Sequence, residues 1–88
     1  MIDSAQIRGA RALLDISQAD LAEIADLHVA TIRRIEAATG VRGAAETVVK
    51  IQKALEKAGI EFIPAEGGKG PGVRLRHEEA DAPDRRRR

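Results

Sequence analysis

Two stretches of the chain decide its fold: ISQADLA at residues 16–22 and TIRRIE at residues 31–36. In the first, Ser17 precedes Asp20 by three positions, so each side chain can accept a hydrogen bond from the other's backbone N–H at a helix start. Apolar residues then follow at helical spacing and predict a helix over roughly 18–25. The second stretch lies on a further short helix, predicted at about 28–37.

Asp26-Leu27-His28 interrupts the apolar pattern between these two helices. Two short helices joined by so short a connection, in a small helical domain, have the geometry of a helix-turn-helix. The residues on either side of the pair agree with this geometry. A capping box at Asp3 and Gln6 predicts a first helix over 4–14, and an apolar stripe ending at Gly59 predicts a fourth helix over 44–58.

The chain changes character after Gly59. Residues 60–63 and 73–76 have the branched, alternating pattern of strands, and the Pro- and Gly-rich residues 64–72 between them predict a long loop. We therefore expect a mainly α fold, with a four-helix helix-turn-helix domain over 1–59 followed by a short β-hairpin over 60–76. Residues 77–88, ending in four arginines, have the composition of a disordered charged tail.

Composition limits the class of protein. With 88 residues, 43% of them hydrophobic and 33% charged, the chain has the size and balance of one soluble domain. It lacks cysteine, which excludes disulfides, thiol nucleophiles and sulfur-ligated zinc. Neither a secretory signal nor a membrane span is visible in the sequence, so we expect a cytoplasmic protein.

The helix at 28–37 carries the chemistry. With Ile32 as the inward reference and about 100° per residue, Ile35 and His28 lie on the same side. The outward residues are Ala30, Arg33, Arg34 and Ala37. Arginine can bond guanine with two hydrogen bonds or pair with a phosphate, and small neighbours allow close approach to base edges. The alternative interpretation is that Arg33 and Arg34 belong to an ordinary helix face that contacts only solvent.

Resemblance decides between these two interpretations. The residues IRGAR at 7–11, ISQADLA at 16–22 and TIRRIE at 31–36 closely resemble the Cro and phage-repressor (XRE) family. The resemblance covers about 7–58 and implies double-stranded DNA as the partner. It implies base contacts from Val29, Ala30, Arg33 and Arg34, and phosphate contacts from Gln18, His28, Thr31 and Arg42. It also implies an internal ion pair between Arg11 and Glu36, which gives Glu36 a structural role.

The chain departs from the family pattern in three places. Asp26 stands where the family has a glycine in left-handed backbone, a conformation that costs Asp roughly 1 kcal/mol. Val29 and Ala30 can offer only apolar contact, for instance to a thymine methyl group. The hairpin also replaces the family's fifth helix. The resemblance therefore implies the mode of binding and leaves the target sequence open.

Other possible sites have simpler explanations. Residues 67–70 suggest a phosphate-binding loop, but such loops precede a helix, and here a strand follows. His28 and His77 are too isolated to indicate a metal, and Ser4 and Ser17 have the positions of helix caps rather than nucleophiles. We expect no enzyme activity, no metal and no cofactor.

A single helix-turn-helix unit reads only a few base pairs, so we expect a homodimer that reads an inverted repeat. We expect the C-terminal strands of two copies to pair across a two-fold axis, which would satisfy a strand edge and bury the apolar face formed by Phe62, Val73 and Leu75, the expected dimer interface. The alternative is a hairpin folded back on the fourth helix of its own chain. The rival function is an adaptor or antitoxin-like protein whose main role is to bind another protein.

Overall fold

The computed structural model describes residues 1–38 and 44–77. Within these ranges the chain forms four helices and one antiparallel pair of strands. The helices are α1 (Ser4–Leu14), α2 (Gln18–Ala25), α3 (Val29–Ala37) and α4 (Ala45–Lys57), and the strands are β1 (Ile60–Ile63) and β2 (Gly72–Leu75). The expected mainly α fold followed by a hairpin is confirmed.

Both capping boxes form as expected. The Asp3 carboxylate accepts from the Gln6 backbone N–H at 2.9 Å, and the Gln6 side chain accepts from the Asp3 backbone N–H at 2.9 Å. Ser17 and Asp20 make the same exchange at the start of α2, at 2.9 and 3.0 Å. These exchanges satisfy backbone donors that a helix start leaves without intrahelical partners.

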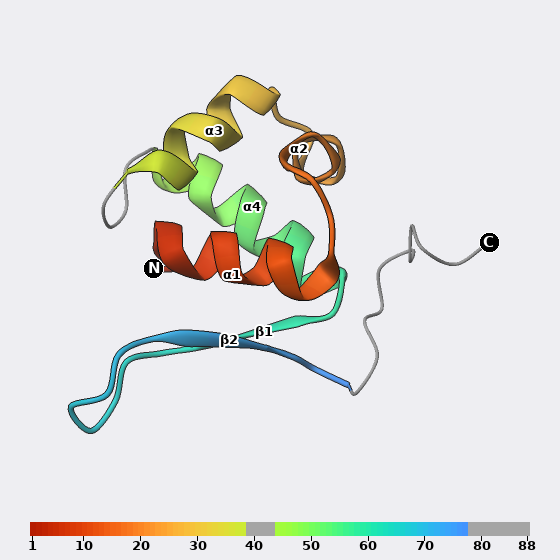
Figure 1. The fold of residues 1–88 in the computed structure, drawn as a ribbon. Coiled ribbons are helices and arrows are strands. Elements are labelled where there is room, and N and C mark those ends of the chain that lie inside the picture. Colours follow the sequence, from red (N-terminus) through yellow and green to blue (C-terminus); the bar gives the residue numbers. More distant parts are fainter. Residues whose placement is uncertain (39–43, 78–88) are drawn as a thin grey trace.

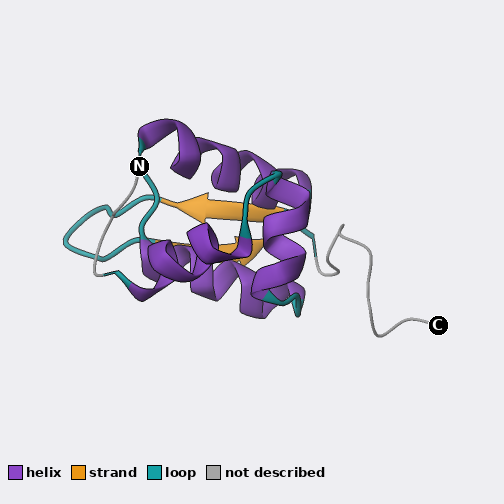
Figure 2. Cartoon of the chain, turned by 90° about the horizontal axis from the view of Figure 1, so that it is seen from above, coloured by secondary structure: helices purple, strands orange, loops and turns teal. Residues whose placement is uncertain are grey.

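The helices enclose a core of aliphatic side chains. Its members with almost no exposed surface include Ile7, Leu21, Ile32, Ile35, Ile51, Leu55 and Ile60. In Figure 1, α3 lies at the top, α1 and α4 lie below it, and the hairpin lies beneath both of them. Viewed from above, β1 and β2 run side by side under the helical layer (Figure 2).

The hairpin packs on α1 because Gly9 allows a close approach. A Cβ atom at Gly9 would lie 3.1 Å from Cγ2 of Val73, closer than nearly all real contacts of this kind. Phe62, Val73 and Leu75 are partly buried against the core of their own chain. The apolar face expected at the dimer interface is thus partly covered within one chain, by α1 as well as by α4.

The tip of the hairpin is more ordered than the sequence suggests. The backbone groups of Glu66 and Lys69 exchange two hydrogen bonds of 3.0 Å around a two-residue turn, Gly67-Gly68, in which φ is 61° and 79°. Positive φ at both positions is the pattern of a type I′ turn, which matches the twist of paired strands. Residues 64–71 thus form the long connection predicted between the strands, and the structure adds a tight turn at its tip.

The regular pairing of β1 with β2 nevertheless stops before the chain reaches this turn. Ile63 pairs with Gly72, and continuing the same register toward the tip sets Pro64 opposite Pro71. Proline has no N–H to donate, so two facing prolines end the regular strands there. Strand β2 consequently begins at Gly72, one residue earlier than predicted, while Arg76 still donates its backbone N–H to Gly59 O at 2.8 Å.

Candidate nucleic-acid interface

The turn between α2 and α3 has the backbone that the sequence predicts. Asp26 ends α2 in the left-handed conformation, with φ 58° and ψ 51°. The Leu27 N–H donates to Ala22 O at 2.9 Å, which closes the helix end. Asp15 ends α1 in the same conformation, with φ 57°. The left-handed backbone of Asp15 was not predicted, because aspartate at a helix end is also compatible with ordinary turns.

Helix α3 has one buried and one exposed face. Ile32 and Ile35 are 0% and 2% exposed and anchor the helix on the core. Ala30, Arg33, Arg34 and Ala37 are all exposed, as the helical spacing predicts. Neither arginine forms an ion pair with another described residue, so both guanidinium groups are available to a ligand. The outward face therefore presents two cations between small side chains.

The beginning of α3 differs from the expectation in two respects. His28 is the N-cap residue, with extended backbone, and it is exposed rather than on the inward side. Its imidazole makes no capping hydrogen bond. Val29 is half-buried and packs against the core, which leaves Ala30 as the more accessible of the two expected apolar contacts. Thr31 is half-buried as well.

Glu36 is the centre of a polar cluster beneath the exposed face. Its side chain is 3% exposed and receives Arg11 Nε at 2.8 Å and Arg11 Nη2 at 2.9 Å. This arrangement raises the pKa of Arg11, chiefly through the hydrogen bonds to Glu36 and in opposition to desolvation. Arg11 also donates to Ile16 O at 3.1 Å, so one guanidinium joins α1, α3 and the start of α2.

Gln18 belongs to the same cluster. Its amide Nε2 donates to Glu36 Oε1 at 3.1 Å. The sequence analysis placed Gln18 at the DNA phosphates alone and did not foresee this second partner. An amide nitrogen carries two hydrogens, so one remains for a phosphate while the other holds Glu36.

The first turns of α1 hold the C-terminal end of α3. Ser4 is 1% exposed and its hydroxyl donates to Ile35 O at 2.6 Å. Arg8 donates through Nη1 to Glu36 O. Both acceptors lie in the last turn of α3, where carbonyl groups lack intrahelical partners and favour a positive charge. The expectation that Ser4 caps α1 is therefore wrong: Asp3 is the N-cap, and Ser4 is the first residue of the helix. The sequence offered no local signal for the contact of Ser4 with α3.

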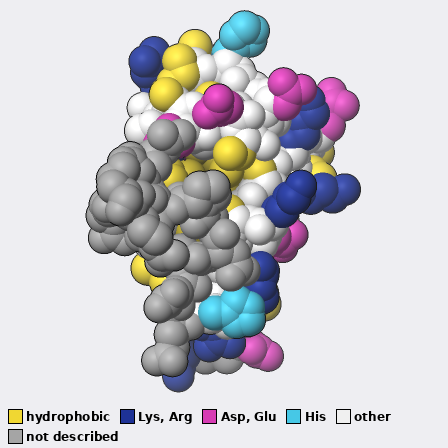
Figure 3. All heavy atoms as spheres, turned by 90° about the vertical axis from the view of Figure 1, so that its right-hand side faces the viewer, with side chains coloured by type: hydrophobic (Ala, Val, Ile, Leu, Met, Phe, Trp, Pro, Cys, Tyr) yellow, Lys and Arg dark blue, Asp and Glu magenta, His cyan; other side chains and the backbone are white. Residues whose placement is uncertain are grey.

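The surface beside this helix pair mixes charges of both signs. Figure 3 shows Asp and Glu side chains next to Lys and Arg on the face that carries α2, with hydrophobic atoms between them. Where described residues are visible on this face, they do not form the broad basic stripe that marks non-specific DNA binding. On the exposed face of α3, within the part of the chain that the structure describes, the basic side chains are those of Arg33 and Arg34. Arg42, the remaining expected phosphate contact, lies outside the described residues.

The comparisons agree with this geometry. A family model described as helix-turn-helix matches residues 7–62. No curated protein matches the chain. Among the described residues, none of the helices has the length and hydropathy needed to cross a membrane, and no group of three metal-ligating side chains comes together. Since the match covers well over half of the sequence, the chain belongs to the helix-turn-helix family of Cro and phage-repressor (XRE) type, a family of DNA-binding regulators that is not typically enzymatic.

Proposed function

We propose that this protein regulates transcription by reading a specific inverted repeat as a homodimer, with the exposed face of α3 in the major groove. The observation that carries the proposal is the contrast between the two faces of α3. Ile32 and Ile35 are fully buried, whereas Arg33 and Arg34 are exposed beside Ala30 and Ala37. A helix fixed on one side, with cations and small residues on the other, suits base-edge contacts.

The contacts of α1 add to this argument. Helix α3 has only nine residues, so its orientation depends on tertiary contacts more than on intrinsic helix stability. Ser4, Arg8 and Arg11 supply such contacts at its C-terminal end. A recognition helix held in one orientation can discriminate between base pairs, because bidentate hydrogen bonds tolerate little angular error.

The position of the hairpin supports one kind of dimer. The hairpin lies on the side of the helical layer opposite to α3 (Figure 1). If two copies stacked the outer faces of their hairpins, the two α3 helices would point in opposite directions and could not reach one duplex. If two copies joined strand edges about an axis perpendicular to the sheet, both α3 helices would face the same side.

Strand edges are available for this arrangement. Within the described residues β1 and β2 pair only with each other, so each strand retains one edge without a neighbouring strand. Unpaired edges present backbone donors and acceptors that can pair with another chain. The outer face of the hairpin, by contrast, carries the exposed ion pair between Glu61 and Arg74, whose charges a stacked dimer would have to desolvate.

Binding of duplexes from the DNA upstream of its own gene tests the first half of the proposal. Arg33→Ala and Arg34→Ala should each lower affinity by about 1–3 kcal/mol where the arginine reads a base, and should relax preference at one position. Lys57→Ala is the matched control, since it removes an exposed cation from the last turn of α4. Equal affinity of wild type and both arginine variants would contradict the proposal.

Sedimentation and salt dependence test the remaining parts. The full chain should sediment as a dimer, and binding should weaken steeply with salt, because each neutralised phosphate releases counterions. A monomer at all concentrations would contradict the dimer. The absence of any DNA complex at low salt, together with a co-purifying protein partner, would instead indicate an adaptor.

A further inference from the structure

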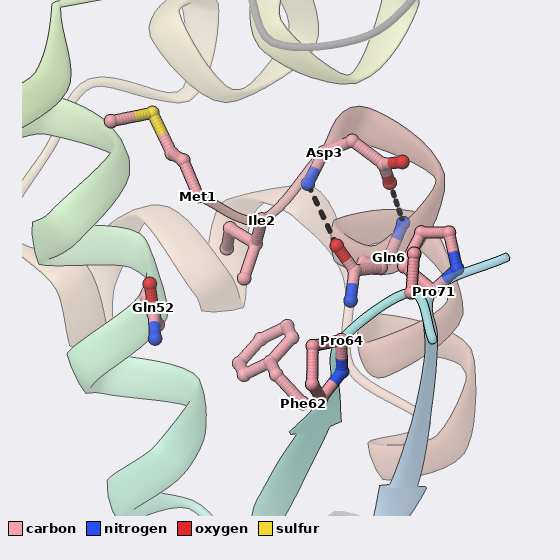
Figure 4. Close-up of a pocket in the computed structure, with 9 residues that line it drawn as sticks. Met1, Ile2, Asp3, Gln6, Gln52, Phe62, Pro64 and Pro71 are labelled. Carbon is pink, nitrogen blue, oxygen red and sulfur yellow. Dashed lines mark hydrogen bonds between the residues drawn. The ribbon is translucent and has the colours of Figure 1, made fainter. Parts of the chain in front are cut away.

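Gln6 connects α1 to the hairpin through its side-chain amide. The residue is only 6% exposed, although glutamine usually lies at the surface. Its Oε1 accepts from the Asp3 backbone N–H, and its Nε2 donates to Gly72 O at 3.0 Å and to Ile63 O at 3.4 Å. Figure 4 shows this amide directed from α1 toward the segment that carries Pro64 and Pro71.

The two carbonyl groups bound by Gln6 mark the point where regular strand pairing stops. Ile63 and Gly72 are the last pair of the ladder, and the facing prolines follow them. Neither proline has a backbone N–H, so neither can donate a hydrogen bond that would continue the strand pairing. The amide of Gln6 therefore holds both strands of the hairpin at their outer end, while Gly9, which has no Cβ, leaves room for Val73 of β2 farther along α1.

The same part of α1 also holds the recognition helix. Ser4 and Arg8, one helical turn apart, bind the carbonyl groups of Ile35 and Glu36 in the last turn of α3. Gln6 lies between them in sequence, about 200° around the helix from Ser4, since successive residues turn by about 100°. Helix α1 thus holds α3 on one side and the hairpin on the other.

We propose that Gln6 is a positioning residue that sets the spacing between the two recognition helices of the dimer, and so the length of the spacer in the inverted repeat. This inference rests on the proposed homodimer joined through the hairpins. In such a dimer the hairpin carries the two-fold axis, and the angle between hairpin and α3 sets where the second α3 meets the DNA. Inserting one base pair moves a half-site by about 3.4 Å and rotates it by about 35°.

A rigid connection admits one spacing, because both half-sites are engaged together only when the geometry fits. A flexible connection between the hairpin and α3 would also allow both half-sites to be bound at neighbouring spacer lengths. The amide of Gln6 supplies rigidity that packing alone does not, since hydrogen bonds to two carbonyl groups restrict sliding of the hairpin along α1. Spacer selectivity is therefore the property that should depend on Gln6.

The test compares wild type with Gln6→Met, which keeps the length of the side chain and removes its hydrogen bonds. Gln52→Met is the matched control. Gln6 and Gln52 line one pocket together with Met1 and Phe62 (Figure 4). The amide of Gln52, however, donates to Glu56 of its own helix at 3.2 Å. Half-sites selected from a random DNA pool are arranged as inverted repeats whose spacers differ by one base pair, and a duplex with one half-site serves as reference.

Wild type and Gln52→Met should prefer one spacer by about tenfold or more, since a misfitting spacer loses the gain from simultaneous engagement. Gln6→Met should bind adjacent spacers within about threefold of each other, with single half-site affinity within about twofold of wild type. A purely structural role would instead lower binding to every duplex in proportion to the folded fraction, which circular dichroism measures.

Gln6→Glu is the second variant, because it retains an acceptor for the Asp3 N–H and turns a carboxylate toward the two hairpin carbonyl groups. Undiminished spacer selectivity in a folded Gln6 variant would overturn the inference and leave the dimer intact. Loss of folding in both variants would make Gln6 a stability determinant and would also overturn it. A wild-type protein that bound the inverted repeat no better than one half-site would refute the homodimer itself.

Discussion

Arg11 and Glu36 lie 25 residues apart in the chain and form a two-pronged ion pair, with Nε–Oε2 at 2.8 Å and Nη2–Oε1 at 2.9 Å. The carboxylate is almost completely buried, whereas the side chain of Arg11 remains 23% exposed. Removing one member of a buried pair leaves a charge without compensation, and this costs more than the pair contributes as a whole. The ion pair is therefore best tested by removing each partner and then both.

Arg11→Met should lower the free energy of unfolding by about 3 kcal/mol, because Gln18 and Arg8 cannot neutralise the buried carboxylate as Arg11 does. Glu36→Gln should cost less, because it removes the buried charge. In a double-mutant cycle measured by urea unfolding, the double variant should be more stable than the sum of the single effects predicts. Additive effects would show that the two side chains do not interact energetically.

Gly9→Ala should destabilise the protein despite the better helix propensity of alanine. Alanine is favoured over glycine inside a helix by about 1 kcal/mol, but the added Cβ would lie 3.1 Å from Cγ2 of Val73. Valine has a stiff side chain and cannot easily turn away. In a Val73→Ala background the contact disappears, so the same substitution should become stabilising. Thermal unfolding of the four proteins checks this reversal of sign.

Gly67→Ala should destabilise the hairpin by about 1 kcal/mol, since a left-handed backbone brings Cβ close to the carbonyl oxygen. The cause is backbone strain alone, because nothing lies within 4 Å of a Cβ at this position. Gly67→Asn should cost less, because asparagine tolerates this conformation in type I′ turns. Gly70→Ala is the control, as Gly70 has equal space and no positive φ. Equal effects at both glycines in chemical denaturation would contradict the turn assignment.

Gln18→Ala should have two separable effects. Losing the hydrogen bond to Glu36 should lower stability by about 1 kcal/mol, and losing a phosphate contact should weaken all DNA sequences about equally. Gln18→Glu should be more destabilising than Gln18→Ala, because it sets a second carboxylate against Glu36. Urea unfolding and binding to two unrelated duplexes measure the effects independently. A change of base preference in Gln18→Ala would contradict the phosphate assignment.

Glu61 should titrate below the usual range of glutamate. Hydrogen bonds from Arg74 lower the pKa of Glu61, and Glu61 in turn raises the pKa of Arg74. Because the pKa of Glu61 is lower in the folded state, its contribution to stability is present above the ordinary glutamate pKa of about 4.3 and is lost as pH falls through the lowered value. Carboxyl NMR titration should show the pKa of Glu61 rising in Arg74→Gln. An unchanged pKa would mean that the pair does not persist in solution.

The helices could be predicted closely because their signals are local. Each capping box joins residues three positions apart, and the apolar spacing of α1 and α4 reports a single buried face. The long connection between the strands was predicted, but the type I′ turn at its tip was not, since a run of glycines and prolines is compatible with both a loop and such a turn. The two are distinguished only by whether Glu66 and Lys69 meet across the turn.

In the candidate site, too, some positions could be predicted from the sequence and others could not. The outward position of Arg33 and Arg34 follows from helical spacing once Ile32 faces the core. The partial burial of Val29 and the exposure of His28 could not be predicted from helical spacing. Both residues stand at the start of the helix, where the backbone enters from the turn and the spacing of 100° per residue does not yet hold.

By itself, the sequence determined where helices begin and end and which face of α3 is turned outward. The tertiary structure alone decided which distant groups meet: Ser4 with Ile35, Gln6 with Gly72, and Gly9 with Val73. It also decided that the apolar face of the hairpin is partly covered by its own helices. The reason is physical. Caps and spacing act between residues within one or two helical turns, whereas these contacts depend on how α1 packs against elements that are remote in the chain.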